Sequence, residues 1–290
     1  MRDGGAPEQA AAGSSSGLRG QLGRETGPMA GLLQSDRKAL VVAIDHAMSS
    51  GVVPGWEHPA ERLEAVLAGE PDAILTTFGI LKCFGSMIRL RARTLLRLDG
   101  GLSDYLESWG EYTQWESLYS VEDALRLGAD AVIVNFFLGG PIELKTTAAV
   151  ARAASDCLRW GMPLVVEALP ARTSTSSSMT DPERVASAAR IAAELGADLI
   201  KTYYTGSIES FRDVTSSCPV PVLIAGGEKM DSERAVIQMV KESLDAGGAG
   251  VFFGRNIWQH ARPAHMVRAL RALIHDRASV DQALDMLPDS

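Results

Sequence analysis

The sequence predicts an α/β protein folded as a (β/α)8 barrel, the TIM-barrel architecture, and three observations support this fold class. Short apolar segments of strand length alternate with longer segments of helical periodicity. A glycine often ends a helical segment just before the next apolar segment, as in "LGADAVIV" and "LGADLIKT". The short segments are apolar nearly throughout, which is typical of parallel strands that are covered on both faces.

Eight predicted strands follow one another along the chain. They span residues 39–46, 72–79, 93–100, 130–137, 163–170, 198–204, 220–227 and 249–255. Eight βα units in about 250 residues fit one closed barrel better than two separate domains. An open, doubly wound sheet is the alternative, and the lack of a GxGxxG motif after the first predicted strand weakens it.

The first 30 residues differ in composition from the rest of the chain. They are rich in Gly, Ala and Ser and contain few side chains that are large enough to bury. We therefore predict a disordered N-terminal tail over residues 1–30, followed by a single barrel domain over residues 31–290.

Composition and charge exclude several functional classes. The chain of 290 residues has a formal net charge of −8 and lacks a long basic run, so no nucleic-acid partner is expected. No apolar run approaches the ~20 residues of a membrane helix, so no membrane partner is expected either. The three cysteines, Cys83, Cys157 and Cys218, are isolated and lack metal-ligand spacing. They favour a reducing, cytoplasmic location and the absence of a metal site.

One lysine, Lys201, stands in the middle of the apolar strand predicted over residues 198–204. A buried ammonium is costly unless it is paired or deprotonated. Alternation along the strand aims this side chain into the mouth of the barrel, where nearby cations would lower its pKa, as a Schiff-base nucleophile requires. The alternative is a structural lysine that only pairs with Asp45 or Glu167.

Polar residues also occur where other predicted strands end, which is where a (β/α)8 barrel places its active site. Asp45 and His46 end the first predicted strand, Asn135 lies in the fourth and Glu167 in the fifth. A carboxylate in such a position can accept or donate protons near an imine. His46 can contribute to binding or proton transfer, although a single histidine at a strand end is more often a hydrogen-bonded structural residue.

Glycines at the ends of the last two predicted strands indicate a phosphate site. Gly226 and Gly227 end the seventh strand, Lys229 follows them, and Gly254 and Arg255 end the eighth. In barrels of this type, backbone N–H groups at these turns approach an anion, and an arginine adds a charge-assisted hydrogen bond. The alternative is that the glycines only form turns and the arginine lies on the surface.

Longer stretches of the chain resemble a known enzyme family. "GADLIKTYYTGSIESFRDVTSSCPVPVLIAGGEKM", "GAGVFFGRNIWQH" and "AIDHAMSSG" resemble class I, Schiff-base aldolases of the archaeal-type fructose-bisphosphate aldolase and deoxyribose-phosphate aldolase-like group. That group includes amino-dideoxy-heptulosonate synthases and a quorum-signal thiolase. The resemblance implies that Lys201 forms the Schiff base and that Asp45 assists proton transfer. It also implies phosphate-binding turns at Gly226, Gly227, Gly254 and Arg255.

The sequence departs from that family at one informative position. Aldolases of the group carry a proton-transferring tyrosine just before a proline at the end of the fifth strand, and here Leu169 precedes Pro170. A leucine cannot transfer a proton. Glu167 lies two residues earlier, hence on the same face of the strand, and is predicted to replace the tyrosine as acid or base. Tyr203 and Tyr204 are further candidates, although strand tyrosines more often pack.

We therefore predict a class I aldolase, a lyase in which Lys201 forms an imine with a ketose phosphate or a substrate like dihydroxyacetone phosphate. No metal and no cofactor are expected, because the iminium supplies the electrophile. Thiolase-like acyl transfer and a specialised-metabolism aldolase or transaldolase are the enzymatic alternatives, and a phosphosugar-binding barrel is the non-enzymatic one. The resemblance also implies a homo-oligomer.

Overall fold

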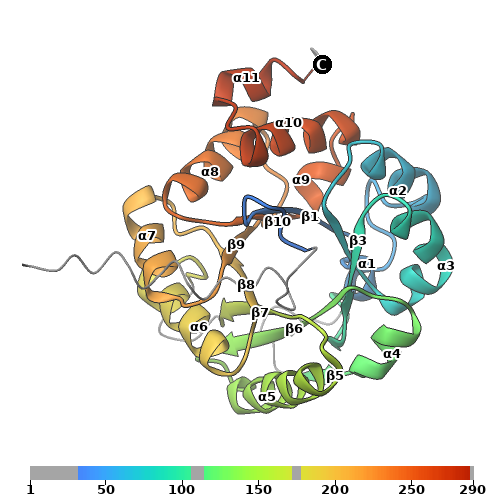
Figure 1. Cartoon of the computed structure of the whole chain (residues 1–290), viewed down its shortest axis with the longest axis vertical. Coiled ribbons are helices and arrows are strands. Elements are labelled where there is room, and N and C mark those ends of the chain that lie inside the picture. The colour runs from blue at the N-terminus through green and yellow to red at the C-terminus, as the bar shows by residue number, and fades with distance from the viewer. Residues whose placement is uncertain (1–31, 106–113, 172–177, 288–290) are drawn as a thin grey trace, which may run out of the picture.

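In a computed structural model that describes residues 32–105, 114–171 and 178–287, eight parallel strands close into a barrel (Figure 1). The strands are β1 (Ala39–Ala43), β2 (Ala73–Thr76), β3 (Arg93–Arg97), β6 (Ala131–Leu138), β7 (Leu164–Pro170), β8 (Leu199–Tyr203), β9 (Val222–Ala225) and β10 (Gly250–Phe253). They follow chain order around the barrel, and β10 pairs with β1 to close it. The predicted TIM barrel and its eight strands are confirmed. The predicted tail over residues 1–30 lies outside the described residues.

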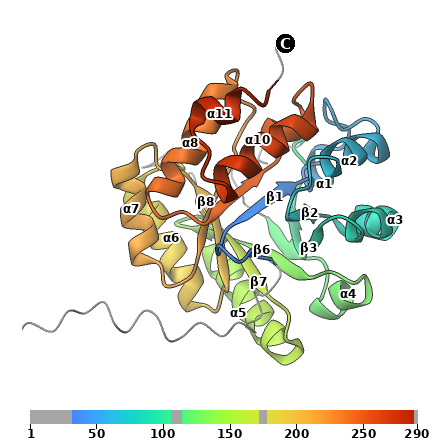
Figure 2. The ribbon, with the colours of Figure 1, turned by 45° about the horizontal axis from the view of Figure 1, so that its top comes forward.

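Helices surround the strands (Figure 2). They are α1 (Ala47–Ser50), α2 (Pro59–Leu67), α3 (Phe78–Arg89), α4 (Val121–Arg126), α5 (Glu143–Trp160), α6 (Pro182–Glu194), α7 (Ile208–Ser217), α8 (Glu233–Asp245), α9 (Arg255–Trp258), α10 (Pro263–His275) and α11 (Val280–Leu284). Side chains such as Thr77, Asp181 and Ser232 start their helices by accepting a hydrogen bond from a backbone N–H three residues ahead. None of the described helices is both long and apolar enough to span a membrane.

Alternation along the strands divides their side chains between two cores. One set fills the barrel interior, and it includes Val41, Leu75, Leu95, Ile133, Val165, Leu199, Leu223 and Phe252. The intervening residues, such as Val42 and Ile74, pack against the surrounding helices. Because side chains alternate with a period of two, the next inward positions after Leu95, Val165 and Leu199 are Arg97, Glu167 and Lys201. The fold therefore places charged side chains above an apolar barrel core.

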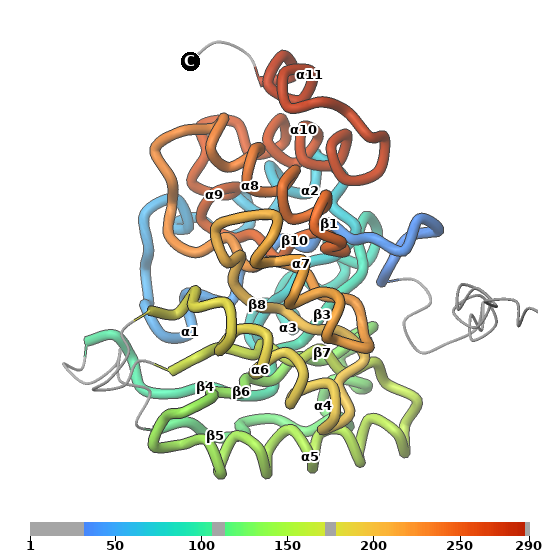
Figure 3. Tube along the Cα trace, turned by 90° about the vertical axis from the view of Figure 1, so that its left-hand side faces the viewer, coloured from blue at the N-terminus to red at the C-terminus, as the bar shows by residue number. Residues whose placement is uncertain are grey.

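An antiparallel pair of short strands, β4 (Asp99–Gly101) and β5 (Trp115–Ser117), lies between β3 and α4 and was not predicted. The strand predicted over 93–100 ran through the actual end of β3 at Arg97. Two glycines follow that end, and a Cβ on Gly101 would lie 2.3 Å from the Trp115 ring, so only glycine fits there. Figure 3 shows β4 and α1 at one end of the barrel, opposite the segment that leads into β1.

A group of four polar residues holds the opposite end, and we call it the basal clasp: Asp36, Asp72, Arg271 and His275. The two ring nitrogens of His275 lie 2.9 Å from Asp36 Oδ2 and 2.9 Å from Asp72 Oδ2. Arg271 donates to Asp72 Oδ1 at 2.9 Å. Since both ring nitrogens face carboxylates, the imidazolium form of His275 satisfies both contacts. The clasp joins the residues before β1 and β2 to the end of α10.

Candidate active site

Lys201 projects from β8 into the mouth of the barrel and is 6% exposed. Its Nζ lies 2.8 Å from Glu167 Oε1, because Lys201 and Glu167 are register partners on the adjacent strands β8 and β7. The same Nζ lies 5.8 Å from the centroid of the Phe252 ring, an apolar neighbour in the barrel core. The lysine thus has both features that the sequence suggested as alternatives: it faces the mouth, and it is paired with Glu167.

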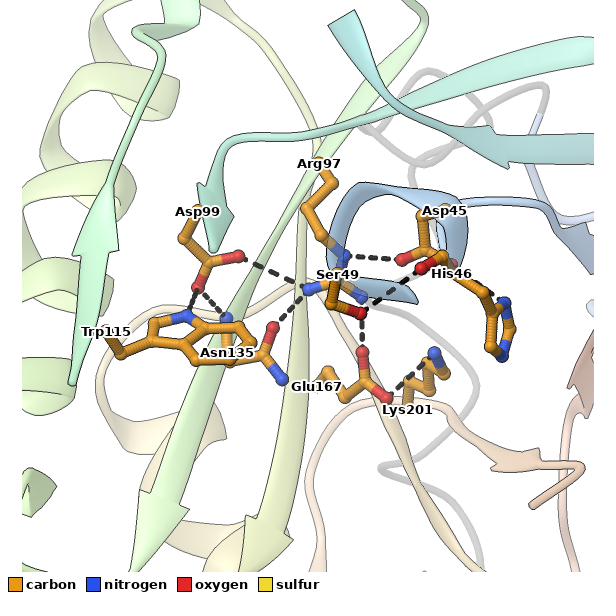
Figure 4. Close-up of polar contacts among 9 residues, drawn as sticks. All are labelled: Asp45, His46, Ser49, Arg97, Asp99, Trp115, Asn135, Glu167 and Lys201. Atoms are coloured by element: carbon orange, nitrogen blue, oxygen red, sulfur yellow. Dashed lines mark hydrogen bonds and ion pairs between the residues drawn. The ribbon is translucent and has the colours of Figure 1, made fainter. Parts of the chain in front are cut away.

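Arg97, at the end of β3, connects most of the polar groups around this pair (Figure 4). Its guanidinium donates to Asp45, to Glu167 and to the Asn135 side chain, and also to Asp99 at 3.2 Å. The Arg97 side chain is 6% exposed, so these bonds form away from solvent. A planar guanidinium with five donors can bridge several acceptors at fixed geometry, whereas a lysine cannot.

The cations set the ionisation of the two carboxylates that sequence analysis selected. Burial alone raises the pKa of Glu167, but Lys201 and Arg97 outweigh burial and hold that pKa below its ordinary value. In the same way, burial opposes ionisation of Asp45, yet Arg97 and Lys201 bring its pKa well below the ordinary range. Glu167 and Asp45 are therefore carboxylates at neutral pH. Asp99 differs, because burial outweighs Arg97 and raises its pKa.

The β4–β5 hairpin supports this network from one side. Asp99 Oδ2 accepts a hydrogen bond from Trp115 Nε1 at 2.8 Å and another from the backbone N–H of Asn135 at 2.5 Å. The Trp115 ring meets Phe137 edge-on, with 5.1 Å between ring centroids. Asp99 thereby joins the hairpin, β3 and β6, and it fixes the direction from which Arg97 enters the site.

His46 lies beside Asp45 at the edge of the site. Its Nδ1 is 3.6 Å from Asp45 Oδ1, and the atom is buried without a hydrogen-bond partner among the described residues. Burial lowers the pKa of His46 despite the attraction of Asp45, so the ring is neutral at pH 7. The ring meets Trp258 edge-on at 5.7 Å, and a Cβ on Gly254 would lie 2.6 Å from His46 Cε1. His46 thus links the site to the turn after β10.

These groups surround a cavity of about 240 Å³. Its lining comprises Asp45, His46, Met48, Ser49, Arg97, Gly100, Gly101, Trp115, Leu118, Asn135, Phe137, Glu167, Leu169, Lys201 and Tyr203. Leu169 lies at the cavity wall, where the resemblance would place a tyrosine. Tyr203 also lines the cavity, whereas Tyr204 points away from it and donates to Glu242 on α8 at 2.9 Å.

A larger cavity, of about 930 Å³, lies at the other end of the barrel. Its arginines are engaged in other contacts: Arg91 pairs with Glu64, Arg93 with Asp130 and Arg271 with Asp72. (β/α)8 barrels carry their chemistry at the C-terminal ends of the strands. The smaller cavity around Lys201 is therefore the candidate active site.

Of the residues predicted to bind substrate or phosphate, His46 lines the smaller cavity and the other five do not. Gly226, Gly227 and Lys229 follow β9, and Gly254 and Arg255 follow β10, so all five lie at the same end of the barrel as Lys201. Gly254 abuts His46 and thus borders the cavity. Lys229 is exposed.

Several hydrogen-bond donors in these two turns have no partner among the described residues. Arg255 Nε is buried without a hydrogen-bond partner among the described residues. Gly227 has a positive φ of 64°, and its N–H forms no hydrogen bond within the described part of the chain. Gly226 differs, because its N–H donates to Phe252 O at 3.3 Å and so serves the barrel. Gly227 and Arg255 therefore offer donors to an anion.

Asn256 holds the two turns together. Its Nδ2 donates to Gly226 O at 2.9 Å and to Glu228 O at 3.2 Å, and its Oδ1 accepts from the N–H of Met230 at 2.8 Å. It is 4% exposed. The turn after β9 is therefore fixed to the start of α9 through one amide side chain.

Sequence analysis did not select Arg97, Asp99 or Trp115, and it did not give Asn135 a role. Arg97 carried a usable signal, since it stands two residues after Leu95 in a strand whose alternate positions point inward. Asp99 and Trp115 carried none, because their contact depends on the hairpin. Within the described segments, no group of three or more His, Cys, Asp or Glu side chains is arranged to hold a metal ion.

Comparison with known proteins decides the family. A profile described as DeoC/LacD family aldolase matches residues 39–260. The chain belongs to the DeoC/LacD aldolase family. A 2-amino-3,7-dideoxy-D-threo-hept-6-ulosonate synthase of Halobacterium salinarum is 34% identical over 259 residues, which cover 87% of this chain and 92% of that protein. An uncharacterized aldolase of Saccharolobus solfataricus is 32% identical over 257 residues, covering 86% of this chain and 94% of that one.

Among solved structures, a Schiff-base-forming fructose-1,6-bisphosphate aldolase is 31% identical with a TM-score of 0.77, and the match covers 86% of this chain and 98% of that one. The predicted fold, family and class are thereby confirmed: this DeoC/LacD aldolase is a lyase of the class I, Schiff-base type. That result sets aside the non-enzymatic alternative.

Proposed function

We propose that this DeoC/LacD aldolase makes or breaks a carbon–carbon bond through an imine between Lys201 and a phosphorylated ketone. The Lys201–Glu167 pair carries the proposal, because an amine and a proton acceptor lie 2.8 Å apart on the wall of a cavity at the C-terminal end of the barrel. One similar solved protein is a fructose-1,6-bisphosphate aldolase, which supports a sugar-phosphate substrate here.

Glu167 serves imine formation. It accepts a proton from the Lys201 ammonium, and the neutral Nζ then attacks the substrate carbonyl carbon. The protonated Glu167 returns its proton to the carbinolamine hydroxyl, which leaves as water and gives the iminium. Arg97 favours the ionised form of Glu167, so the carboxyl is poised to give its proton back.

Asp45 serves the carbon–carbon bond. In the cleavage direction its carboxylate takes the proton from the substrate hydroxyl, the bond breaks, and the electron pair moves to the iminium nitrogen to form an enamine. In the synthetic direction Asp45 returns that proton to the aldehyde oxygen as the bond forms. Asp45 is ionised in the resting site, as a base requires, and Arg97 joins it to Glu167.

The turns after β9 and β10 are proposed to hold the phosphate. The buried, unpartnered Nε of Arg255 and the N–H of Gly227 support this assignment, together with Gly254, which lets the chain approach His46 closely. Gly226 contributes the turn rather than a donor, and Lys229 adds positive charge from the surface.

Further parts of the proposal rest on the sequence. Acyl transfer of the thiolase type and transaldolase transfer would start from the same imine and differ in the second substrate. A cytoplasmic location agrees with the three free cysteines. We also propose a homo-oligomer and a single barrel domain over residues 31–290.

Reduction of the imine tests the nucleophile. Incubation with dihydroxyacetone phosphate and borohydride should add one reduced substrate to Lys201, identified by intact mass and peptide mapping. Lys201→Met should abolish the adduct and turnover while the fold persists, since methionine has a similar length and is apolar. Lys241→Met is the matched control, because Lys241 lies on α8 and pairs only with Asp245 among the described residues. An adduct that survives in Lys201→Met would refute the assignment.

A further inference from the structure

The cavity has two chemically different parts. Asp45, Arg97, Glu167 and Lys201 supply the charged part. The polar side chains His46, Ser49 and Asn135 border this charged part. The rest of the wall is largely apolar and is formed by Gly100, Gly101, Met48, Trp115, Leu118, Phe137, Leu169 and Tyr203. Phe137 and Leu169 are 0% and 4% exposed, and they pack in one cluster with Trp115 and Tyr203.

The charged part offers little to a second anion. Arg97 and Lys201 are the only cations among the described lining residues, and both are paired with carboxylates. With Asp45 and Glu167 ionised, the formal charges of the lining cancel. A phosphate placed here would meet two carboxylates and donors that are already in use, so its desolvation would not be compensated.

The apolar part accommodates a small group without charge. Gly100 stands where Leu118 and Met48 converge, since a Cβ there would lie 2.9 Å from Leu118 Cδ1 and 2.9 Å from Met48 Cε. The whole cavity, at about 240 Å³, is smaller than the ~300–1,000 Å³ of pockets for drug-sized ligands. Burial of a short hydrocarbon chain against these side chains is favourable, whereas burial of sugar hydroxyls without partners is not.

We propose that the second substrate of this aldolase is a short-chain, uncharged aliphatic aldehyde, and that Leu169, Phe137 and Trp115 select it. The inference rests on the proposed function, because the aldehyde reacts with the enamine formed on Lys201. Asp45, which is ionised in the resting site, takes the proton from the α-carbon of the iminium as the enamine forms. The enamine carbon then attacks the aldehyde carbon, the electron pair of the C=O bond moves to the aldehyde oxygen, and that oxygen takes the proton from Asp45. Water then hydrolyses the iminium, which releases the product and restores the Lys201 amine.

Competing acceptors test the inference. With dihydroxyacetone phosphate as the donor, kcat/KM is measured for butanal, for D-glyceraldehyde and for D-glyceraldehyde 3-phosphate. Butanal should exceed both others by ~10-fold or more, the range that apolar pocket contacts provide. A preference for D-glyceraldehyde 3-phosphate or D-glyceraldehyde would overturn the inference, and so would a lack of turnover with butanal while the imine still forms.

Two substitutions at Leu169 locate the selectivity. Leu169→Ser should lower kcat/KM for butanal ~10-fold and leave borohydride trapping at Lys201 intact, because the serine removes apolar contact but no reacting group. Leu169→Lys should move the preference toward D-glyceraldehyde 3-phosphate by supplying an unpaired ammonium. Leu158→Ser is the control, since Leu158 is 86% exposed on α5 and should change neither ratio. An unchanged acceptor ratio in both Leu169 variants contradicts the assignment.

Borohydride trapping of the imine distinguishes a failure of the proposed function from a failure of the inference about the second substrate. If dihydroxyacetone phosphate and borohydride leave Lys201 unmodified, the proposed function fails and the aldehyde inference fails with it. If the adduct forms and the acceptor ratio favours a phosphorylated or hydroxylated aldehyde, only the inference about the second substrate fails.

Discussion

Arg97 donates to side chains from β6 and β7, to Asp45 just after β1 and to Asp99, so a single guanidinium contacts the two carboxylates to which we assign different roles. Its own pKa is raised: burial opposes the charge, but Asp45, Glu167 and Asp99 outweigh burial. It therefore remains a cation throughout the pH range in which an aldolase is assayed. Asp45 and Glu167 consequently stay ionised to lower pH than free carboxyl groups do.

Replacement of Arg97 should change the pH dependence of the reaction. In Arg97→Gln the guanidinium no longer depresses the pKa of Asp45 and Glu167, so both values rise. Because the proposed bases are the ionised forms, the acidic limb of kcat/KM should move to higher pH. At a fixed pH on that limb, kcat/KM should fall about tenfold for every pH unit by which the limb moves. A pH profile of kcat/KM measures the effect.

Two variants accompany this experiment. Arg97→Lys keeps the positive charge but loses the bridging geometry, so it should keep most of the wild-type acidic limb and lower kcat. It also covers the case in which Arg97→Gln folds poorly, since breaking a buried ionic network costs about 3–5 kcal/mol. Arg93→Gln is the matched control on the same strand, where Arg93 pairs with Asp130 at the other end of the barrel. An acidic limb that is the same in all three variants would show that Arg97 does not set these ionisations.

Among individual residues, the sequence predicted the charged side chains that interrupt apolar strands. Lys201 and Glu167 are such residues, and the resemblance pointed to Asp45. Arg97 is also a charged residue in a mainly apolar strand. It was not selected, because polar residues were sought at the predicted strand end, residue 100, and Arg97 lies three residues earlier. The ion pairs themselves could not be predicted, because they depend on which strands become neighbours and in which register.

The turns after β9 and β10 function as one element. Asn256 joins them through three hydrogen bonds, so the position of Arg255 is linked to that of Gly227. The element presents Arg255 and the N–H of Gly227 outside the set of residues that line the cavity around Lys201, and Gly254 brings the turn after β10 against His46. The proposed phosphate site and the proposed site of the second substrate are thus formed by different residues.

Removal of the Arg255 side chain should weaken binding of the phosphate selectively. Arg255→Ala should raise KM for dihydroxyacetone phosphate by an amount equivalent to about 1.5–3 kcal/mol, the contribution of a charge-assisted hydrogen bond. KM for dihydroxyacetone, which lacks the phosphate, should stay nearly constant. Steady-state kinetics with both ketones provide the comparison, with Arg262→Ala, an exposed arginine before α10, as the control. Equal increases for the two ketones would count against the phosphate site.

Helices and strands could be predicted where the hydrophobic periodicity extended over many residues and the helix caps were clear. All eight barrel strands were found, but their ends were placed too far along the chain in several cases. The strand predicted over 72–79 stops at Thr76, because Thr77 caps α3 by accepting from the N–H of Ile80. The hairpin of β4 and β5 was missed, since three-residue strands have no periodicity to detect.

The molecule as a whole keeps its chemistry and its basal clasp at opposite ends of the barrel. In the clasp, His275 joins Asp36 to Asp72, and burial of the ring is outweighed by these two carboxylates, so the pKa of His275 is raised. Asp72 has a lowered pKa: burial opposes ionisation, but hydrogen bonds from His275 and Leu40 outweigh it. The clasp therefore stabilises the fold most at pH values above the range in which Asp72 titrates and below the range in which His275 titrates.

The raised pKa of His275 predicts a stability that depends on pH. Its contribution is fully present below the pKa of an unfolded histidine and is lost as pH rises through the higher folded value. His275→Gln should therefore lower the free energy of unfolding by on the order of 1–2 kcal/mol at pH 6, the scale of a charge-assisted bond that is partly screened. At pH 9 the difference should nearly vanish. Urea denaturation at both pH values measures it.

The matched control is His58→Gln, since His58 precedes α2 and caps it with no side-chain hydrogen bond. That variant should show little change at either pH. Activity of His275→Gln below its melting temperature should match the wild type, because the clasp lies opposite the cavity. A His275→Gln effect of equal size at pH 6 and pH 9 would mean that packing, rather than charge, is what the ring contributes.

The Arg97 network also divides the reaction between the two halves of the chain. Asp45 and Arg97 belong to the first four βα units of the barrel, whereas Glu167 and Lys201 belong to the last four. On a ribosome, Asp45 and Arg97 emerge before Lys201, the proposed nucleophile, has been synthesised. The halves become one catalyst only when β7 pairs with β6 and β10 pairs with β1. We therefore expect the complete site to form late in synthesis, when the last strands pair and close the barrel. The folding of any single βα unit is not sufficient to form it.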